Sequence, residues 1–373
     1  MYLTKEEERL LESENETIAT AMKLLVTVGK MFDAERLVKV KSAHVSGVSY
    51  DNIGDAGLEW LESLNAKVSV PTTLNPAGFD VKRWREMGIG EEFYEKQMRI
   101  IKAFERLGVK ITLTCTPYYI HKPAFGDHLA WAESSAVVYA NSLIGARTNR
   151  EAAITALAAA IVGRTPFFGL HVKENRAPTV RLKVSGDLAA AGYEAGKLIG
   201  GEIPYVIFDR KPSEWELKLF GAALAATGSV PMFHSPGITP EAEEFEVPSE
   251  SVEVEGRGAL DCDPDLIAVG CPHASEEELK MIYELLKGEK VKREFWVFTS
   301  RSVASKAAQV VEKLESLGVK VFSDTCMVVS PATDTFECVV VNSGKALHYV
   351  PERRRCEVGF ADIFTCVKLA RTP

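Results

Sequence analysis

The chain of 373 residues has no uninterrupted apolar run of the roughly 20 residues that a bilayer span needs. It has no basic runs either, and its 44 basic and 52 acidic residues give a net charge of −8. This balance excludes the electrostatic footprint of a nucleic-acid-binding protein. The N-terminal stretch MYLTKEEERLLESENE is too polar and acidic for a signal peptide. We therefore expect a cytoplasmic protein without membrane or nucleic-acid partners.

The signatures of several common enzyme classes are also missing. The sequence contains no G-x-G-x-x-G, Walker A, H-E-x-x-H or G-x-S-x-G motif, so nucleotide-binding, zinc-peptidase and serine-hydrolase interpretations lack support. No Cys-x-x-Cys occurs, which disfavours a thioredoxin-type site or a zinc ribbon. The seven cysteines are an odd number in a chain without a signal peptide. That count argues against a disulfide framework and for thiols or metal ligands.

Helical and strand periodicities alternate along almost the whole chain. EEFYEKQMRIIKAFERLG and EAAITALAAAIVG are typical of helices, and IPYVIF and REFWVFTS are typical of core strands. The alternation predicts an α/β fold with mainly parallel sheets. We divide the chain into a first α/β region at 1–180 and a second part at 181–373 with one or more α/β regions. The polar stretch near 235–258 is expected to be an irregular linker.

Three cysteines lie at or just beyond the predicted ends of strands, where the loops of α/β sheets form sites. Cys115 ends VKITLTC, Cys326 ends VKVFSDTC, and Cys271 follows IAVG. We expect Cys271 on the turn into the helix EEELKMIYELLKG, where the helix dipole favours a thiolate. The other four lie in different settings: Cys262 in the polar linker, Cys338 inside ECVVV, Cys356 after three arginines and Cys366 in a short helical segment.

These motifs carry a resemblance to a known family. VGCPHASEEELKMIYELLKG is similar to the strand–turn–helix that presents a cluster-ligating cysteine in the aconitase superfamily. FSDTCMVVSP falls where that superfamily has a Cys-x-x-Cys pair, of which this chain keeps one cysteine. Together with LTCTPYY and NSLIGARTNRE, they most resemble the aconitase X family, over nearly the whole chain. The resemblance implies an aconitase-like, multi-layer catalytic region that lacks the mobile swivel domain.

The resemblance also implies an iron–sulfur cluster of the 4Fe-4S type, or its 3Fe-4S form as isolated. Cysteine thiolates hold such clusters, and in a hydro-lyase one iron has no protein ligand. The matching residues are Cys115, Cys271 and Cys326, with Cys366 as a reserve ligand. The alternative is that each is a small buried residue, as free cysteines often are.

Candidate substrate contacts lie on further predicted loops. In SGVSYDN, Gly47 would let the consecutive amides of Val48 and Ser49 form an anion-binding nest. In TLNPAG, Asn75 and Pro76 lie on another strand-end loop. Ordinary turn chemistry explains both motifs equally well.

Charged residues supply the remaining candidates. Glu133 and Ser134 are candidate catalytic residues, and Arg147 could pair with a substrate carboxylate or phosphate. Lys345, beside a glycine, is a candidate phosphate contact, although most lysines are simply solvated. His273, two residues after a candidate ligand, could support the metal site, or it could be an ordinary exposed turn residue.

The family resemblance implies the large subunit of a hydro-lyase that dehydrates (R)-5-phosphomevalonate to trans-anhydromevalonate 5-phosphate in the archaeal mevalonate pathway. In the superfamily a serine on the swivel domain acts as the base. Since the sequence leaves no room for that domain, a separate small subunit is expected to supply it. Two alternatives stay open: a dehydratase for another hydroxy acid, such as cis-3-hydroxyproline, and a non-catalytic, cluster-binding scaffold subunit.

Overall fold

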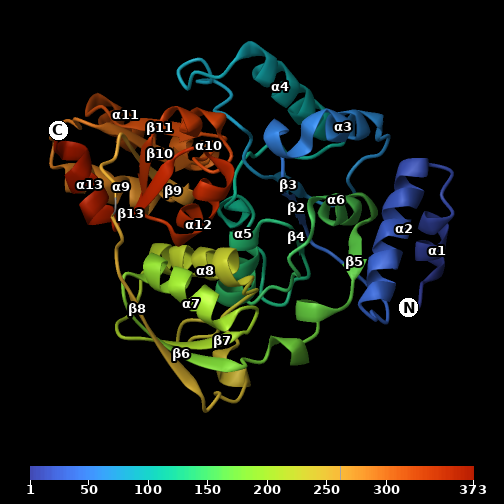
Figure 1. Ribbon diagram of the computed structural model, residues 1–373. Helices are drawn as coiled ribbons and strands as arrows, with labels where there is room; N and C mark the ends of the chain where they lie inside the picture. The colour runs from blue at the N-terminus through green and yellow to red at the C-terminus, as the bar shows by residue number, and fades with distance from the viewer. Residues whose placement is uncertain (261) are drawn as a thin grey trace.

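The computed structural model describes residues 1–260 and 262–373, and it folds into three regions with separate sheets (Figure 1). The first region, residues 1–179, has a parallel sheet of order β3-β2-β4 and an antiparallel pair, β1 with β5. The alanine-rich α6 packs on this sheet, with eight of its ten residues buried. The elements are α1 (Lys5–Leu11), α2 (Glu16–Met31), β1 (Leu37–Lys39), β2 (Ala43–Val45), α3 (Tyr50–Ser63), β3 (Thr72–Leu74), α4 (Glu91–Arg106), β4 (Ala130–Trp131), α5 (Ser134–Tyr139), α6 (Ala153–Val162) and β5 (Arg164–Pro166).

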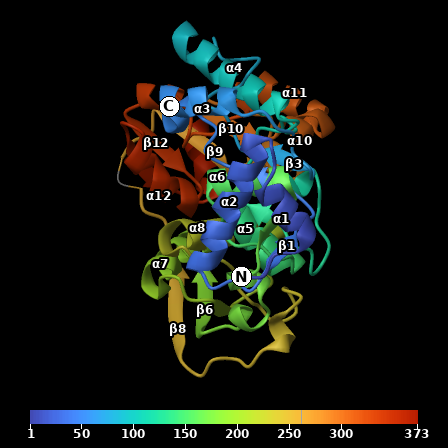
Figure 2. The same cartoon turned by 90° about the vertical axis from the view of Figure 1, so that its right-hand side faces the viewer.

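The middle region, residues 180–256, has a parallel sheet of order β7-β6-β8. Its helices α7 and α8 lie between this sheet and the third region, as both views show (Figures 1 and 2). The elements are β6 (Val180–Gly186), α7 (Leu188–Ile199), β7 (Pro204–Phe208), α8 (Glu214–Gly228) and β8 (Ser251–Gly256).

The expectation of an irregular linker over 235–258 is wrong for its last part, which forms β8. This strand pairs in parallel with β6 along its whole length. Val254 is buried while Glu253 and Glu255 are exposed. Alternation of this kind is the period-2 pattern of a half-exposed strand, and the glutamates made its composition look like that of a linker.

The third region, residues 266–371, has a parallel sheet of order β11-β10-β9-β12-β13. All nine residues of the central strand β9 are buried, as expected for a parallel strand with both faces covered. One face packs with Phe79 and Trp84, so it points toward the first region. The elements are β9 (Leu266–Ala274), α9 (Glu276–Leu286), β10 (Glu294–Thr299), α10 (Arg301–Lys306), α11 (Ala308–Ser316), β11 (Lys320–Ser323), β12 (Cys338–Val341), α12 (Gly344–Arg353), β13 (Glu357–Phe360) and α13 (Ile363–Arg371).

The mainly parallel α/β architecture confirms the predicted fold class. Within the described ranges, none of the helices combines the length and apolar character that a transmembrane segment requires.

A disulfide joins Cys262 to Cys338, so the argument against disulfides from the cysteine count is wrong for this pair. Hydrogen bonds bring the two together: the N–H of Asp265 donates to the carbonyl oxygen of Cys338, and the N–H of Cys338 donates to the Asp265 carboxylate. An odd number of cysteines cannot reveal such a pairing, because it depends on how the segment before β9 lies against β12.

Replacing Cys262 by serine should lower the free energy of unfolding by about 2–4 kcal/mol, because the cross-link restricts the unfolded chain. The bonded residues are 76 positions apart, a long loop for this effect. Denaturant unfolding of the metal-free chain measures the difference, with Cys356→Ser as the control because Cys356 carries a free thiol. Equal stability of the Cys262 variant and the parent would contradict the expectation.

Candidate active site

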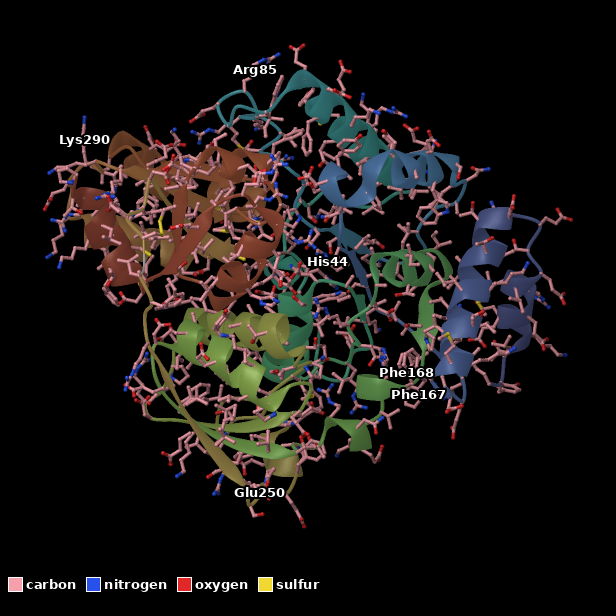
Figure 3. The ribbon with its side chains drawn as sticks, viewed as in Figure 1. His44, Arg85, Phe167, Phe168, Glu250 and Lys290 are labelled. Atoms are coloured by element: carbon pink, nitrogen blue, oxygen red, sulfur yellow. A yellow bond between two sulfur atoms is a disulfide. The ribbon has the colours of Figure 1, made fainter. Side chains whose placement is uncertain are left out.

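A cavity of about 410 Å³ opens between the first and third regions. Asn75 lines the cavity and forms a hydrogen bond with His44, which is labelled near the centre of Figure 3. The inner wall of the cavity is buried, and its outer rim is half-buried, with Asn52, Arg150 and Arg353 exposed to solvent. The inner wall includes Asn75, Pro76, Cys115, Ala132, Glu133, Ser134, Cys271, Cys326, Val328 and Lys345, and the rim includes Ser46, Gly47, Asn52, Arg150, Val329, Tyr349 and Arg353.

Cys115, Cys271 and Cys326 share the inner wall of this cavity. Cys326 follows β11 closely, as expected. The segment before Cys115 is irregular and not a strand, since only Lys110 forms a bridge, to Thr73. The loop nevertheless runs beside β3 and delivers the thiol to the predicted edge of the sheet.

Gly270 sets the direction of the Cys271 side chain. Its φ is 97°, and a Cβ atom there would lie 2.1 Å from the carbonyl oxygen of Phe298, so only glycine fits. The pairing of β9 with β10 shifts register at this point, and Cys271 packs on the face that points toward the first region. Cys271 therefore lies within a buried strand, and the expected position on the turn at the helix N-terminus is wrong.

His273 connects the three segments that carry these cysteines. Its backbone N–H donates to the Cys115 Sγ atom at 3.2 Å. Its ring Nε2 donates to the carbonyl oxygen of Thr325 at 2.8 Å, which leaves Nδ1 to accept from the Thr114 hydroxyl at 2.9 Å. Burial lowers the pKa of His273 to about 4, so the ring is neutral at physiological pH. The histidine is buried, and it fixes the relative positions of the loops before Cys115 and Cys326.

Burial raises the pKa of all three thiols, to about 12 for Cys115. The positive charge of Lys345 lowers each of these pKa values in part. For Cys326, backbone N–H groups act in the same direction. Thiolates at these positions therefore need additional positive charge, which a metal would provide.

Glu133 and Lys345 form a buried ion pair beside the cysteines. Lys345 Nζ donates to Glu133 Oε1, and to Ser135 Oγ at 3.3 Å. Burial by itself raises the pKa of the Glu133 carboxyl, but Lys345 and a hydrogen bond from Asn75 outweigh burial and lower it to about 2. Burial lowers the pKa of Lys345, but the charge and hydrogen bond of Glu133, together with the neighbouring Cys271 and Cys115, outweigh burial and raise it. Both side chains are therefore ionised at neutral pH.

A chain of hydrogen bonds holds the carboxylate of Glu133 in place. Asn75 Nδ2 donates to Glu133 Oε2 at 2.7 Å, and His44 Nε2 donates to Asn75 Oδ1 at 3.0 Å. The other ring nitrogen of His44 accepts from the Thr73 hydroxyl at 2.8 Å. Burial lowers the pKa of His44 to about 4, so this ring is neutral as well. The chain orients Glu133 from the sheet of the first region.

Models of three successive family domains match the chain: "Aconitase X first domain" over residues 1–174, "Aconitase X second domain" over 171–261 and "Aconitase X third domain" over 264–372. The chain belongs to the aconitase X family. The resemblance found in the sequence is confirmed.

The relatives that match this chain carry two names. "Phosphomevalonate dehydratase large subunit" of Methanosarcina mazei is 47% identical over 99% of this chain and 97% of its own length. "Cis-3-hydroxy-L-proline dehydratase" of Pseudomonas aeruginosa is 34% identical, and the match covers 98% of this chain but 69% of that protein. The crystal structure of Thermococcus kodakaraensis aconitase X in its holo-form is 42% identical, with a TM-score of 0.90 over 99% of this chain and 100% of that one.

The donor set in this aconitase X chain fits an iron–sulfur cluster better than a single metal ion. In the described ranges, no three His, Cys, Asp or Glu side chains lie close enough together to hold one ion. Three buried thiols that share a cavity without meeting at a point suit a cluster, in which each thiolate binds a different iron. The hydrogen bond from His273 to Cys115 Sγ is of the kind that tunes cluster sulfurs.

Several sequence-predicted residues reach the cavity: Gly47, Asn75, Pro76, Glu133, Ser134 and Lys345. Others lie outside its lining. Val48 and Ser49 are buried, so of the proposed nest only Gly47 borders the cavity. Arg147 instead donates to the carbonyl oxygen of His171 at 3.3 Å. Cys366 packs in α13 and donates to a backbone carbonyl oxygen, away from the three thiols.

Sequence reasoning missed the polar residues of the rim, namely Ser46, Asn52, Arg150, Tyr349 and Arg353. A signal for two of them was present. Lys345, Tyr349 and Arg353 are spaced four residues apart on α12, which places them on one face of the helix. Given Lys345 as a candidate, helical spacing would have indicated the other two.

Proposed function

We propose that this chain is the large subunit of a phosphomevalonate dehydratase, a hydro-lyase that converts (R)-5-phosphomevalonate to trans-anhydromevalonate 5-phosphate. The observation that carries the proposal is the cavity in which three buried thiols adjoin a buried, ionised Glu133–Lys345 pair. The relatives named large subunits of this enzyme, at 41–47% identity, support this substrate over cis-3-hydroxyproline.

We infer that Cys115, Cys271 and Cys326 hold an iron–sulfur cluster, of the 4Fe-4S type or its 3Fe-4S form. When bound, such a cluster supplies a Lewis acid that assists departure of a hydroxyl group. The protein contributes burial, which keeps water from the cluster, and the Lys345 ammonium, which favours the thiolates.

The dehydration removes a proton from C2 and the hydroxyl group from C3, so the products are an alkene and water. Among the described cavity-lining residues, Glu133 is the sole carboxylate, and with a pKa of about 2 it is a weak base. Lys345 is protonated and cannot accept a proton. The base therefore has to come from elsewhere, and we propose that a small partner subunit supplies it at the open rim.

The proposed function is tested by preparing this chain with its small subunit without oxygen and following alkene formation from (R)-5-phosphomevalonate by NMR. Unphosphorylated mevalonate and cis-3-hydroxyproline serve as comparison substrates. Turnover of phosphomevalonate in preference to both supports the proposal. Equal or faster turnover of either comparison substrate would refute it.

The ion pair in the cavity makes a separate prediction about stability. Lys345→Met should lower the free energy of unfolding by about 3–5 kcal/mol, because it leaves Glu133 charged and buried without its partner. Since the pKa of Glu133 falls from an ordinary 4.5 to about 2, the contribution of the pair is fully present above pH 4.5 and is lost as the pH falls toward 2. Denaturant unfolding at pH 7 and pH 3 measures both effects.

The matched control is the double variant Glu133→Gln with Lys345→Met, which removes both charges. It should be more stable at pH 7 than the Lys345→Met variant, because no buried charge is left alone. The Glu133→Gln single variant completes the comparison. If the double variant loses as much free energy of unfolding as the two single variants lose together, the two side chains are not coupled.

A further inference from the structure

Two arginines on the rim of the cavity have no acidic partner. Arg150 and Arg353 both line the cavity and are exposed. Within the described residues, neither of these two lies within 4 Å of a carboxylate, and no other arginine lines this cavity. Two unpaired guanidinium groups on the rim of one cavity are therefore suited to bind a negatively charged ligand.

Weak contacts to neutral groups orient the two side chains. Arg150 donates to the Tyr349 hydroxyl at 3.3 Å and to the carbonyl oxygen of Ala225 at 3.4 Å. Arg353 donates to Asn52 Oδ1. None of these three contacts neutralises charge, so each guanidinium keeps donors for an anion. Tyr349 precedes Arg353 by one turn of α12, and this places both arginines at the same part of the rim.

Lys345, a third cation of the cavity, already has an acidic partner. Its ammonium is buried and paired with Glu133 at the inner wall. A phosphate group there would have to displace the carboxylate from a desolvated ion pair, which is costly. The sequence-based assignment of Lys345 to a phosphate therefore fits the geometry less well than the two arginines on the rim do.

The buried wall and the exposed arginines of the rim are suited to the two ends of an elongated anionic substrate. The inner wall holds the three thiols and the Glu133–Lys345 pair, and the rim holds Arg150 and Arg353. With the reacting carbons at the inner wall, the far end of the substrate extends toward the rim. In a 5-phosphorylated hydroxy acid, that far end is the phosphate group.

We propose that Arg150 and Arg353 form the subsite for the phosphate group of the substrate, an inference that rests on the proposed function. A guanidinium presents a planar fork of N–H donors that matches phosphate oxygens. Arg150 comes from the first region and Arg353 from the end of α12 in the third region. A phosphate held by both bridges the two walls of the cavity and fixes the substrate along its length.

The test uses the cluster-loaded, two-subunit complex and the variants Arg150→Gln and Arg353→Gln. Each should raise the KM for (R)-5-phosphomevalonate roughly tenfold to a hundredfold, the effect of losing one charge-assisted contact. Turnover of unphosphorylated mevalonate, which lacks the phosphate group, should not change. The charge-retaining variants Arg150→Lys and Arg353→Lys should recover part of the loss.

Arg355→Gln is the matched control, because Arg355 is exposed, close to Arg353 in sequence and outside the cavity lining. It should leave the KM for phosphomevalonate unchanged. Thermal unfolding of each variant checks that the fold is kept. An unchanged KM in both glutamine variants would overturn the subsite.

Binding of (R)-5-phosphomevalonate, measured by anaerobic calorimetry on the same complexes, separates this inference from the proposed function. A complex that binds the compound through the arginines without dehydrating it refutes the reaction and keeps the subsite. A complex that dehydrates it with no effect of the arginine variants refutes the subsite and keeps the reaction. A complex that neither binds nor dehydrates it refutes both.

Discussion

The Cys271→Ser variant, reconstituted with iron and sulfide without oxygen, should contain almost no iron. The parent chain should bind roughly three or four irons and show broad visible absorption, as clusters of this type do. Cys271 lies in a strand whose nine residues are all buried, so no neighbouring residue can move in to replace the thiolate. Cys115→Ser and Cys326→Ser should have the same effect, because each removes one of the three thiols that share the cavity.

Cys366→Ala is the control for this loss. Cys366 is also a buried free thiol, but it lies in α13, packs in a core cluster with residues of α9, and does not line the cavity. Its iron content and absorption should equal those of the parent. Full iron content in the Cys271 variant would remove this residue from the proposed site. Loss of iron in the Cys366 variant would restore that cysteine as a candidate ligand.

The cluster-loaded large chain on its own should dehydrate phosphomevalonate about a hundredfold to ten-thousandfold more slowly than the two-subunit complex, the usual effect of a missing general base. The reason lies in the cavity. Glu133 is a weak base because its pKa is about 2, and Lys345 already carries its proton. The exposed rim leaves room for a partner to bring a base to the substrate and to exclude water.

Steady-state rates of the large chain alone, of the complex, and of a complex with serine-to-alanine changes in the small subunit check this expectation. One serine change should reduce the rate to that of the large chain alone while leaving substrate binding intact. Full activity of the large chain without its partner would refute the two-subunit proposal. The base would then have to be sought in this chain, beginning with Glu133.

The sequence predicted features that depend on local pattern. The parallel α/β architecture follows from periodicity. The family resemblance indicated that Cys115, Cys271 and Cys326 share one site, although only Cys326 directly follows a strand. The orientation of Cys271 could not be predicted, because it depends on how closely Gly270 approaches the neighbouring strand.

Features that depend on packing between the regions were missed. The Glu133–Lys345 pair joins residues 212 positions apart, and no spacing rule connects them. The Cys262–Cys338 disulfide depends in the same way on contacts that form only in the folded chain. Arg147 and Arg150 are three residues apart, yet only Arg150 faces the cavity, because the surrounding chain is too irregular for a periodicity argument.

The distribution of the cysteines along the chain sets an order for biogenesis. Cys115 belongs to the first region, whereas Cys271 and Cys326 belong to the third, so the thiols meet only after the last-synthesised sheet has packed against the first. We therefore expect iron and sulfide to be delivered to the folded protein and not to the nascent chain. The exposed rim offers the entrance, and the proposed small subunit closes it. We expect the chain to fold first, then to receive iron and sulfide, and last to bind the small subunit. A chain that binds the small subunit before it receives iron would remain without a cluster.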